Sequence, residues 1–407
     1  MGEVRTLYLS HLTRPLAFVD SQAVEEVFHG LLKGWDARGG APKDADSAVI
    51  RVIAGNDGYR IECAWLSQSR RFDHKVDAAC ALIAELSQAL LEEYRRLLCL
   101  HSGAVEIGGS LVVLPSHYDA GKSVFAACCA ARGHRVFADD VLPLVSDPGG
   151  GDRGRALGFA ARLRLPLPDD LSGRARAFVD SHSGPASARY RYLKLGDGHL
   201  APFGAEAEIG AFVLLERSAG SEPRLADVGV GEMLRHVVLR NFARDLPASA
   251  ILTRLYRLVA RARRLRLSYG NAEAAVQRLM EALSDRPGGV GTASPDRDTL
   301  LRRPTEPPAE LPMQPGCYLR HPGVATMEVD GETFLIDPQD RSIHHLNPMA
   351  AGLWRLFAEP TSNDEALSVL RAAFPNLPSR QGEADLMQLT LRLRRHGLLL
   401  SAEDPPA

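Results

Sequence analysis

The residues best suited to chemistry lie close together in one part of the chain. Gly121, Lys122 and Ser123 follow a short apolar run, His101 precedes them, and the pair Asp139-Asp140 comes shortly after. In a phosphate-binding loop, backbone N–H groups at a helix start face the anion, the lysine adds positive charge and the hydroxyl binds Mg²⁺. Together with paired carboxylates, this arrangement predicts phosphoryl transfer.

The elements around Lys122 are those that a phosphate loop needs. The apolar run at 110–114 predicts a buried strand, and the helical spacing over 124–129 predicts a helix that stops near Gly133. Ser116 stands where such loops usually begin with glycine, so the loop must accept a side chain there. The expected nucleotide-binding segment is Ser116, His117, Tyr118, Asp119, Ala120, Gly121, Lys122 and Ser123.

A second strand is predicted at 135–138, with Asp139 and Asp140 at its carboxyl end, where ligands collect in α/β sheets. Paired carboxylates there suit metal binding and proton transfer. The alternative is a pair that caps a turn. One of several basic residues could complete a phosphate clamp, although a solvated basic strand face explains them equally well. These residues are Arg162, Arg164, Arg189, Arg191 and Lys194.

Residues 95–145 resemble the catalytic core of HPr kinase/phosphorylase and its smaller relatives. The shared pattern is Leu100-His101, Gly121-Lys122-Ser123, the run Arg-Gly-His-Arg at 132–135, and Asp139-Asp140. The resemblance implies an α/β P-loop fold related to phosphoenolpyruvate carboxykinase, with ATP and Mg²⁺ as cofactors. It further implies that Lys122 holds phosphates, Ser123 and Asp140 bind Mg²⁺, Asp139 is the base, and His101 pairs with Asp139. No match to the later signature loop of the true HPr kinases is found, so reverse phosphorolysis is not expected.

Composition fits a globular, multidomain chain of 407 residues with a formal net charge of −2. This balance gives no sign of nucleic-acid binding, and no apolar segment approaches the ~20 residues of a membrane helix. The start of the chain lacks a secretory apolar core. With neither a membrane helix nor a secretory core, we expect a cytoplasmic protein. Its six cysteines have no zinc-ligand spacing, so we expect reduced thiols.

The kinase-like core has one region before it, at 1–94, and two after it, at 284–312 and 313–403. Residues 1–94 are expected to form an α/β extension, with strands at 48–53 and 59–64 and a helix at 76–98. The core at 95–283 continues through a strand at 210–215 and helices near 230–242, 247–262 and 271–283. A linker rich in proline and glycine is expected at 284–312, because it has few large apolar residues to bury.

Residues 313–403 predict a small winged-helix-like α+β domain of three strands followed by three helices. A hairpin turns at Asp330-Gly331, and Asn347-Pro348 suits the cap and first turn of a helix. The pattern resembles the PqqD-like peptide-recognition domain, which implies that a leader peptide adds as a strand. The alternative is a buried leucine stripe without a ligand. The implied contact residues are Ser342, Ile343, His344, His345, Leu346, Leu386, Leu389 and Leu393.

The two resemblances together predict an ATP- and Mg²⁺-dependent kinase that phosphorylates a Ser or Thr hydroxyl of a ribosomally synthesised precursor peptide. Tethering a leader-binding domain to a kinase raises the effective concentration of the acceptor. Two alternatives remain open. One is a non-catalytic chaperone that binds ATP and the leader peptide, and the other is a kinase of a small free acceptor such as serine. The kinase resemblance also implies a possible homo-oligomer.

Overall fold

The computed structural model describes residues 2–117, 120–146, 151–171, 173–284, 301–302, 314–373 and 379–401. The chain divides into two compact units. Unit 1 comprises residues 1–228, 239–246 and 261–292, and unit 2 comprises residues 229–238, 247–260 and 293–407. Of the linker expected at 284–312, only Ser284, Leu301 and Arg302 lie within the described residues.

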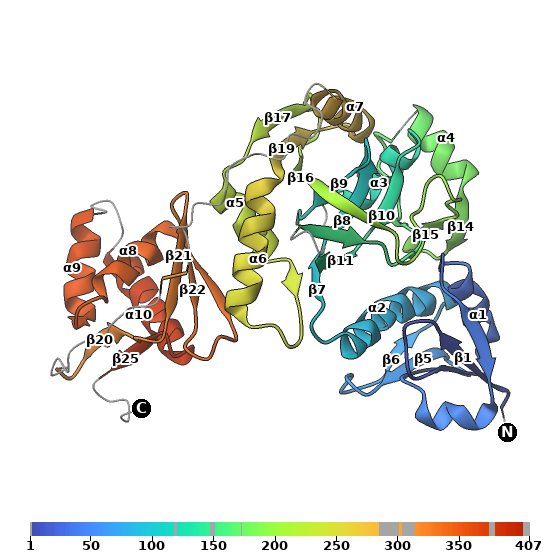
Figure 1. Cartoon of the computed structure of the whole chain (residues 1–407), viewed down its shortest axis with the longest axis horizontal. Helices are drawn as coiled ribbons and strands as arrows, with labels where there is room; N and C mark the ends of the chain where they lie inside the picture. The colour runs from blue at the N-terminus through green and yellow to red at the C-terminus, as the bar shows by residue number, and fades with distance from the viewer. Residues whose placement is uncertain are drawn as a thin grey trace. The chain divides into compact units, whose positions relative to one another are not determined.

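A six-stranded sheet opens unit 1 (Figure 1). Its strands are β1 (Val4–Leu9), β2 (Leu16–Val19), β3 (Ala37–Gly40), β4 (Ile50–Gly55), β5 (Gly58–Cys63) and β6 (Arg70–Phe72), in the order β3-β1-β2-β4-β5-β6. Helices α1 (Gln22–His29) and α2 (Lys75–Glu93) share its core, and a 3₁₀ helix spans Pro42–Ser47. The regular recurrence of Val76, Ala79, Leu82 and Leu86 gives α2 the apolar face that it buries.

The expected helix at 76–98 is too long, because α2 ends at Glu93 and residues 98–101 form a strand instead. Leu98, Cys99 and Leu100 are almost fully buried, and their backbone pairs with strands on both sides. The helical spacing of the apolar residues was therefore overridden by sheet pairing that the local sequence does not show.

The main sheet of unit 1 has ten strands. They are β7 (Leu98–His101), β8 (Gly103–Ile107), β9 (Ser110–Leu114), β10 (Arg135–Ala138), β11 (Val141–Ser146), β12 (Asp152–Arg155), β16 (Glu206–Arg217), β17 (Arg224–Asp227), β18 (Asn241–Phe242) and β19 (Arg263–Tyr269). Strands β9, β16 and β19 run parallel at its centre, while β8, β10 and β11 are added antiparallel. The sequence correctly predicted β9 and β10, which bracket the Gly-Lys-Ser tripeptide.

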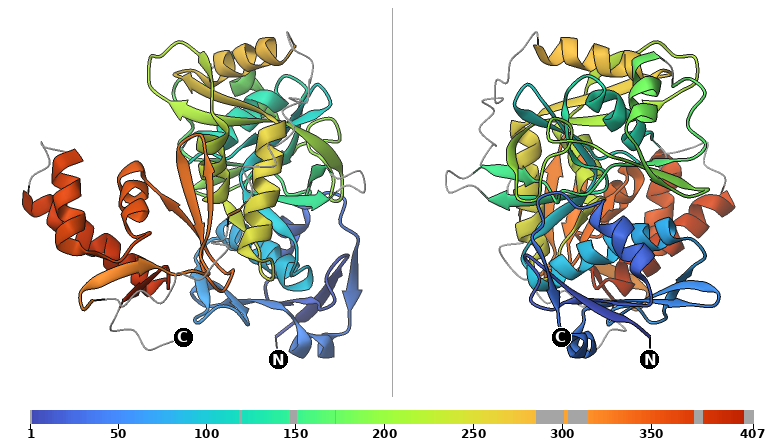
Figure 2. Two further views of the ribbon diagram at one scale, coloured as in Figure 1. Left: turned by 60° about the vertical axis from the view of Figure 1, so that its left-hand side comes forward. Right: turned by 90° about the vertical axis from the view of Figure 1, so that its right-hand side faces the viewer.

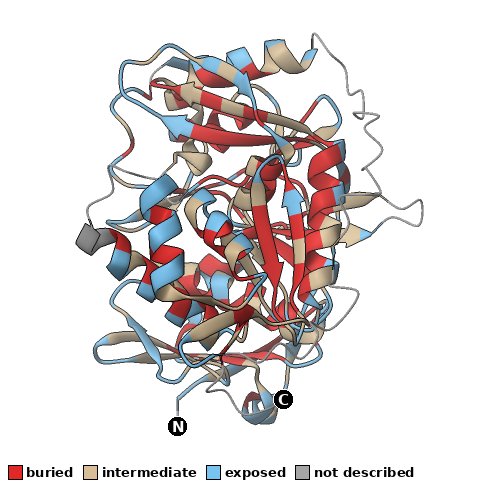
Figure 3. Cartoon of the chain, turned by 90° about the vertical axis from the view of Figure 1, so that its left-hand side faces the viewer, coloured by how far each residue is buried: buried red, intermediate tan, exposed pale blue. Residues whose placement is uncertain are grey.

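Helices α3 (Lys122–Ala130), α4 (Gly173–Ser181) and α7 (Ala272–Ser284) pack around the parallel strands and share one apolar core with them. A small sheet stands beside it, with strands β13 (Arg162–Arg164), β14 (Ser183–Ala186) and β15 (Tyr190–Leu193). Figure 3 shows buried residues concentrated on the strands and on the inward sides of the helices. This mixed α/β architecture agrees with the expected fold class.

Unit 2 contains the C-terminal domain, whose helices and strands lie together in the views of Figures 1 and 2. One sheet has strands β21 (Ala325–Val329), β22 (Glu332–Ile336) and β23 (Ile343–Leu346), as expected, and the hairpin turn is Asp330-Gly331. A second small sheet was not predicted, with β20 (Cys317–Arg320), β24 (Thr361–Ser362) and β25 (Leu399–Ser401). The helices are α8 (Pro348–Leu356), α9 (Asn363–Ala373) and α10 (Ser379–Arg395).

Helices α5 (Val230–Val238) and α6 (Ala248–Arg261) lie within the sequence of the expected kinase-like core, yet nearly all their residues belong to unit 2. Turns of the C-terminal domain hold their N-termini. The Gly231 N–H donates to Asp330 Oδ2 at 3.2 Å, and the Ser249 N–H donates to Asp340 Oδ1 at 2.7 Å. The sequence therefore misassigned these helices, because their packing partners lie about a hundred residues away.

Candidate functional site

The Gly-Lys-Ser tripeptide lies at the start of α3, directly after the loop that leaves β9. Gly121 is the N-cap of this helix and has φ of 83°, a left-handed conformation that favours glycine. A Cβ atom at Gly121 would lie 2.7 Å from the Tyr269 hydroxyl oxygen. Tyr269 in turn donates a hydrogen bond to the Ala120 carbonyl at 3.0 Å, so the loop is fixed just before the helix.

Ser116 replaces the usual loop glycine without taking a left-handed conformation. Its side chain is 2 % exposed, and its hydroxyl oxygen accepts the Leu215 N–H of β16 at 2.7 Å. The serine therefore anchors the loop to the neighbouring parallel strand. Two residues of the predicted nucleotide-binding segment, Tyr118 and Asp119, lie outside the described residues.

Lys122 points back over this loop. Its Nζ donates to the carbonyl oxygens of Ser116 at 3.1 Å and His117 at 3.0 Å. Burial lowers the pKa of the lysine, and the positive charge of Arg240 acts in the same direction, while Asp140 opposes both. The amino group is thus held beside the helix N-terminus, where it can contact the same anion as the backbone N–H groups.

The two carboxylates at the end of β10 face different partners. Asp139 Oδ2 accepts the backbone N–H of Arg162 at 3.0 Å, and Asp140 Oδ2 lies 3.3 Å from the Arg162 guanidinium. His101 Nε2 lies 3.7 Å from Asp140 Oδ1. The resemblance implied a pair between His101 and Asp139, whereas the structure pairs His101 with Asp140. Both carboxylates lie in the bend that follows β10, and Asp140 is the one whose oxygen comes near the histidine ring.

Asp139 is the more buried of these carboxylates. Burial raises its pKa, and the negative charge of Asp140 raises it further. The nearby Ser123 hydroxyl and Arg162 lower the pKa in part. Its Oδ1 atom is buried and makes no standard hydrogen bond within the described residues. A carboxylate oxygen in this state is well suited to accept a proton or a cation.

His101 is expected to be neutral. Burial lowers the pKa of its ring, the positive charges of Lys122, Arg240 and Arg162 lower it further, and Asp140 opposes the change. A neutral ring can donate a hydrogen bond to Asp140 without adding positive charge to the site.

Arg240 is a site residue that the sequence analysis did not select. Its Nη2 lies 3.1 Å from His117 Nδ1, and its carbonyl oxygen accepts the His101 N–H at 2.7 Å. It lies between α5 and α6, 123 residues after His117 in the chain. The pairing of β18 with β7 brings this segment beside His101 and the loop. Of the other basic candidates, Arg162 reaches the carboxylates, whereas Arg191 pairs with Asp180 at 3.3 Å.

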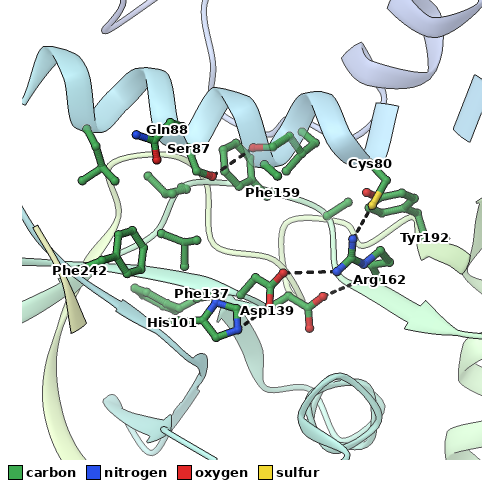
Figure 4. A pocket seen from close by; sticks show the side chains of 18 residues that line it. Cys80, Ser87, Gln88, His101, Phe137, Asp139, Phe159, Arg162, Tyr192 and Phe242 are labelled. Carbon is green, nitrogen blue, oxygen red and sulfur yellow. Dashed lines mark hydrogen bonds and ion pairs between the residues drawn. The ribbon is translucent and has the colours of Figure 1, made fainter. Parts of the chain in front are cut away.

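A cavity of about 270 Å³ opens beside the carboxylates. Figure 4 shows His101 and Asp139 on one wall, with Ser87 and Gln88 of α2 on the opposite wall. Asp140 and Arg162 also line it, so the acidic pair, the histidine and an arginine all face one space. The sequence predicted the polar residues of this wall, but not the contribution of α2.

The oxygen donors around Ser123 fit a nucleotide-bound Mg²⁺. No group of three or more His, Cys, Asp or Glu side chains that could hold a metal occurs in the described part of the chain. Mg²⁺ in phosphoryl-transfer sites is commonly held by only one or two protein oxygens, with phosphates and water completing its shell. The Ser123 hydroxyl and the adjacent carboxylates offer such a partial set.

The predicted peptide-binding segment is only partly available to a ligand. Strand β23 is an edge, since within the described residues it pairs with β22 alone. Ile343, His344 and His345 are half-buried, and the His344 ring packs against His396, with ring centroids 4.6 Å apart. Ser342 lies just before the strand.

The leucines expected to contact a peptide lie in the domain's own core. Leu386 and Leu393 are 2 % and 3 % exposed and pack with the cluster that contains Trp354, and Leu389 lies partly buried against it. The structure therefore corrects the assignment of Leu386 and Leu393 as peptide contacts. The apolar side chains that α10 does expose are Met387 and Leu391. Leucine spacing identified the helix but not which of its faces is buried.

Comparison with known proteins identifies a family only in the C-terminal part of the chain. Residues 332–399 match the family described as Coenzyme PQQ synthesis protein D (PqqD), which confirms a PqqD domain there. No curated protein matches the chain. The solved Hpr(Ser) kinase/phosphatase from Coxiella burnetii is similar at 11% identity, over 46% of this chain and 98% of that chain, with a TM-score of 0.24. No described helix is both long and apolar enough to traverse a lipid bilayer.

Proposed function

We propose that this chain is a Mg²⁺- and ATP-dependent kinase that phosphorylates a Ser or Thr hydroxyl of a ribosomally synthesised precursor peptide. The observation that carries the proposal is the convergence of a glycine-capped Lys122-Ser123 helix start with the buried carboxylate of Asp139. Phosphoryl transfer needs these two parts side by side, one for the nucleotide phosphates and one for the acceptor hydroxyl.

The phosphates of ATP would lie at the N-terminus of α3. Lys122 and Arg240 supply positive charge there, and the backbone N–H groups after Gly121 supply hydrogen-bond donors. Ser123 and Asp140 would hold Mg²⁺, which neutralises charge on the phosphates and orients them. The Ser116 anchor to β16 keeps the loop in place without the usual glycine.

Asp139 would act as the base. Its raised pKa makes it a stronger base than an ordinary aspartate, and its Oδ1 atom is available for a proton. The acceptor oxygen forms a bond to the γ-phosphorus while the bond to the departing ADP breaks, and the hydroxyl proton passes to Asp139. His101 and Arg162 would position Asp140 beside this carboxylate.

The PqqD domain would supply the substrate. Its free edge β23 can accept an added strand, with backbone hydrogen bonds giving affinity and side-chain pockets giving register. Joining this domain to the kinase raises the effective concentration of the acceptor segment, so the catalytic site need recognise only a short stretch around the hydroxyl. The PqqD match supports peptide recognition as this domain's role.

The experiment that tests the proposal is intact-mass analysis of the candidate precursor peptide after incubation with ATP, Mg²⁺ and the full chain. We expect a gain of about 80 Da, the mass of one phosphoryl group. Asp139→Asn should abolish the gain, because the hydroxyl then loses its base. Asp57→Asn, at an exposed turn, is the matched control and should retain it. Binding of both ATP and leader peptide without any mass change would contradict the kinase and favour a chaperone.

A further inference from the structure

The cavity beside Asp139 has two chemically different ends. His101, Asp139, Asp140 and Arg162 form a polar end. The rest of its wall is mostly apolar and draws on three segments: Ile83 and Leu91 of α2, then Phe159 and Phe242. Figure 4 shows Phe159 and Phe242 facing the same space as His101 and Asp139. A ligand that fills this cavity must therefore carry a polar group at one end and an apolar body at the other.

The size of the cavity limits what that body can be. Its volume is about 270 Å³, slightly below the roughly 300 Å³ at which pockets for drug-sized ligands begin. One large side chain fits such a space, whereas a folded peptide segment does not. Apart from Ser87 and Gln88, the wall away from the charged groups offers few hydrogen-bond partners, so a polar group placed there would lose water with little compensation.

We propose that this cavity is a specificity pocket for the bulky apolar or aromatic side chain of a residue next to the phosphorylated Ser or Thr. The inference rests on the proposed kinase function and names its acceptor more closely. Seating the side chain in the apolar end places the neighbouring hydroxyl at Asp139. A free serine molecule would leave the apolar end empty, so it is a poor acceptor for this site.

Two residues of α2 that line the cavity allow the proposal to be tested: Ala84 is small, and Cys80 carries a reactive thiol. Ala84 lines the cavity from an exposed position, so a larger side chain there can enter the pocket without disturbing the core. Cys80 also lines it, and its thiol contacts the Arg162 guanidinium. Alkylation of Cys80 therefore reports occupancy of the pocket even when no phosphate is transferred.

The probes are two acceptors, N-acetyl-Ser-Phe-amide and N-acetyl-Ser-Gly-amide. We expect phosphorylation of the Phe probe, measured as kcat/KM with ATP and Mg²⁺, to exceed that of the Gly probe by about tenfold or more. The Phe probe should also slow alkylation of Cys80, measured by peptide mass mapping, with half-buried Cys317 as the internal reference. The Gly probe should leave the rate of Cys80 alkylation unchanged.

Ala84→Phe should fill the pocket. The variant should then phosphorylate the two probes equally, and the Phe probe should no longer slow alkylation of Cys80, while ATP binding stays unchanged. The matched control is Ala177→Phe, which adds the same side chain at an exposed position of α4. Equal phosphorylation of both probes by the wild type, or a preference for the Phe probe that persists in Ala84→Phe, would contradict the proposed specificity pocket. Neither result would contradict the proposed kinase activity. Protection of Cys80 without transfer would support the pocket and count against the kinase. Neither transfer nor protection would overturn both.

Discussion

The candidate catalytic site of unit 1 and the proposed peptide-binding edge of unit 2 use different physical means. In unit 1, charged groups collect at a half-buried position, where the pKa of Asp139 rises and those of His101 and Lys122 fall. In unit 2, the proposed ligand-binding feature is the outer edge of β23, which within the described residues pairs with β22 alone and lies beside half-buried side chains. The first arrangement suits chemistry on one phosphate, and the second suits a chain of variable sequence held by its backbone.

This contrast predicts that the two functions separate by mutation. The largest effect should come from Lys122→Ala, which removes the positive charge held over the phosphate loop. We expect phosphoryl transfer to fall by roughly a hundredfold or more, as for loss of one charge-stabilising group. Leader-peptide binding, measured by fluorescence anisotropy, should be unchanged. Lys43→Ala, at an exposed position of the 3₁₀ helix, serves as the matched control. Loss of transfer in that variant as well would contradict a specific role for Lys122.

A smaller effect is expected at the peptide edge. Ile343→Pro removes a backbone N–H from β23, so an added strand should lose part of its pairing. We expect the KM for the full precursor to rise about tenfold, while kcat/KM for a short acceptor without leader stays the same. The control is Val369→Ala, which changes an exposed apolar side chain of α9 in the same domain. Proline is not used at this position, because it would break the helix. An unchanged KM in the proline variant would show that the leader does not add to β23.

Burial of the Asp139 carboxylate should also lower the stability of unit 1. Because the pKa of Asp139 is raised in the folded state, its folded form binds a proton more tightly than the unfolded form does. Its ionisation therefore opposes folding at neutral pH, and this cost disappears as the pH falls through the folded pKa. Without ATP or Mg²⁺, we expect Asp139→Asn to raise Tm by a few degrees at pH of about 7 and to lose that advantage near pH of about 4.

The comparison for this measurement is Asp57→Asn, which changes an exposed carboxylate and should leave Tm nearly constant. A lower Tm for Asp139→Asn at neutral pH would mean that its contacts with Arg162 outweigh the cost of burying the charge.

The smallest effect concerns the turn that holds α6 within unit 2. Asp340 has a left-handed φ of 57°, and its carboxylate accepts hydrogen bonds from both the N–H and the hydroxyl of Ser249. Asp340→Gly keeps the backbone conformation and removes the cap, so the free energy of unfolding should fall by about 1 kcal/mol. Urea denaturation measures this change. Asp340→Asn retains an acceptor and should lose less, and an equal loss in both variants would argue against a capping role.

Local sequence was sufficient for elements whose cause lies within a few residues. The apolar run of β9 followed by Gly121 determines a strand, a left-handed turn and a helix start. Asp330-Gly331 sets the hairpin between β21 and β22, and the Asn347 side chain caps α8 by accepting the Ala350 N–H at 2.8 Å. Each depends on backbone conformation or a neighbouring hydrogen bond, which adjacent residues control.

Tertiary structure decided what depends on distant partners. It paired His101 with Asp140, brought Arg240 to the loop through β18, and buried Leu386 and Leu393 in the C-terminal core. It also ended α2 early, so that Leu98–His101 could join the main sheet. Residue types and spacing specify which groups can react, but their neighbours are set by sheet pairing and core packing between segments far apart in the chain.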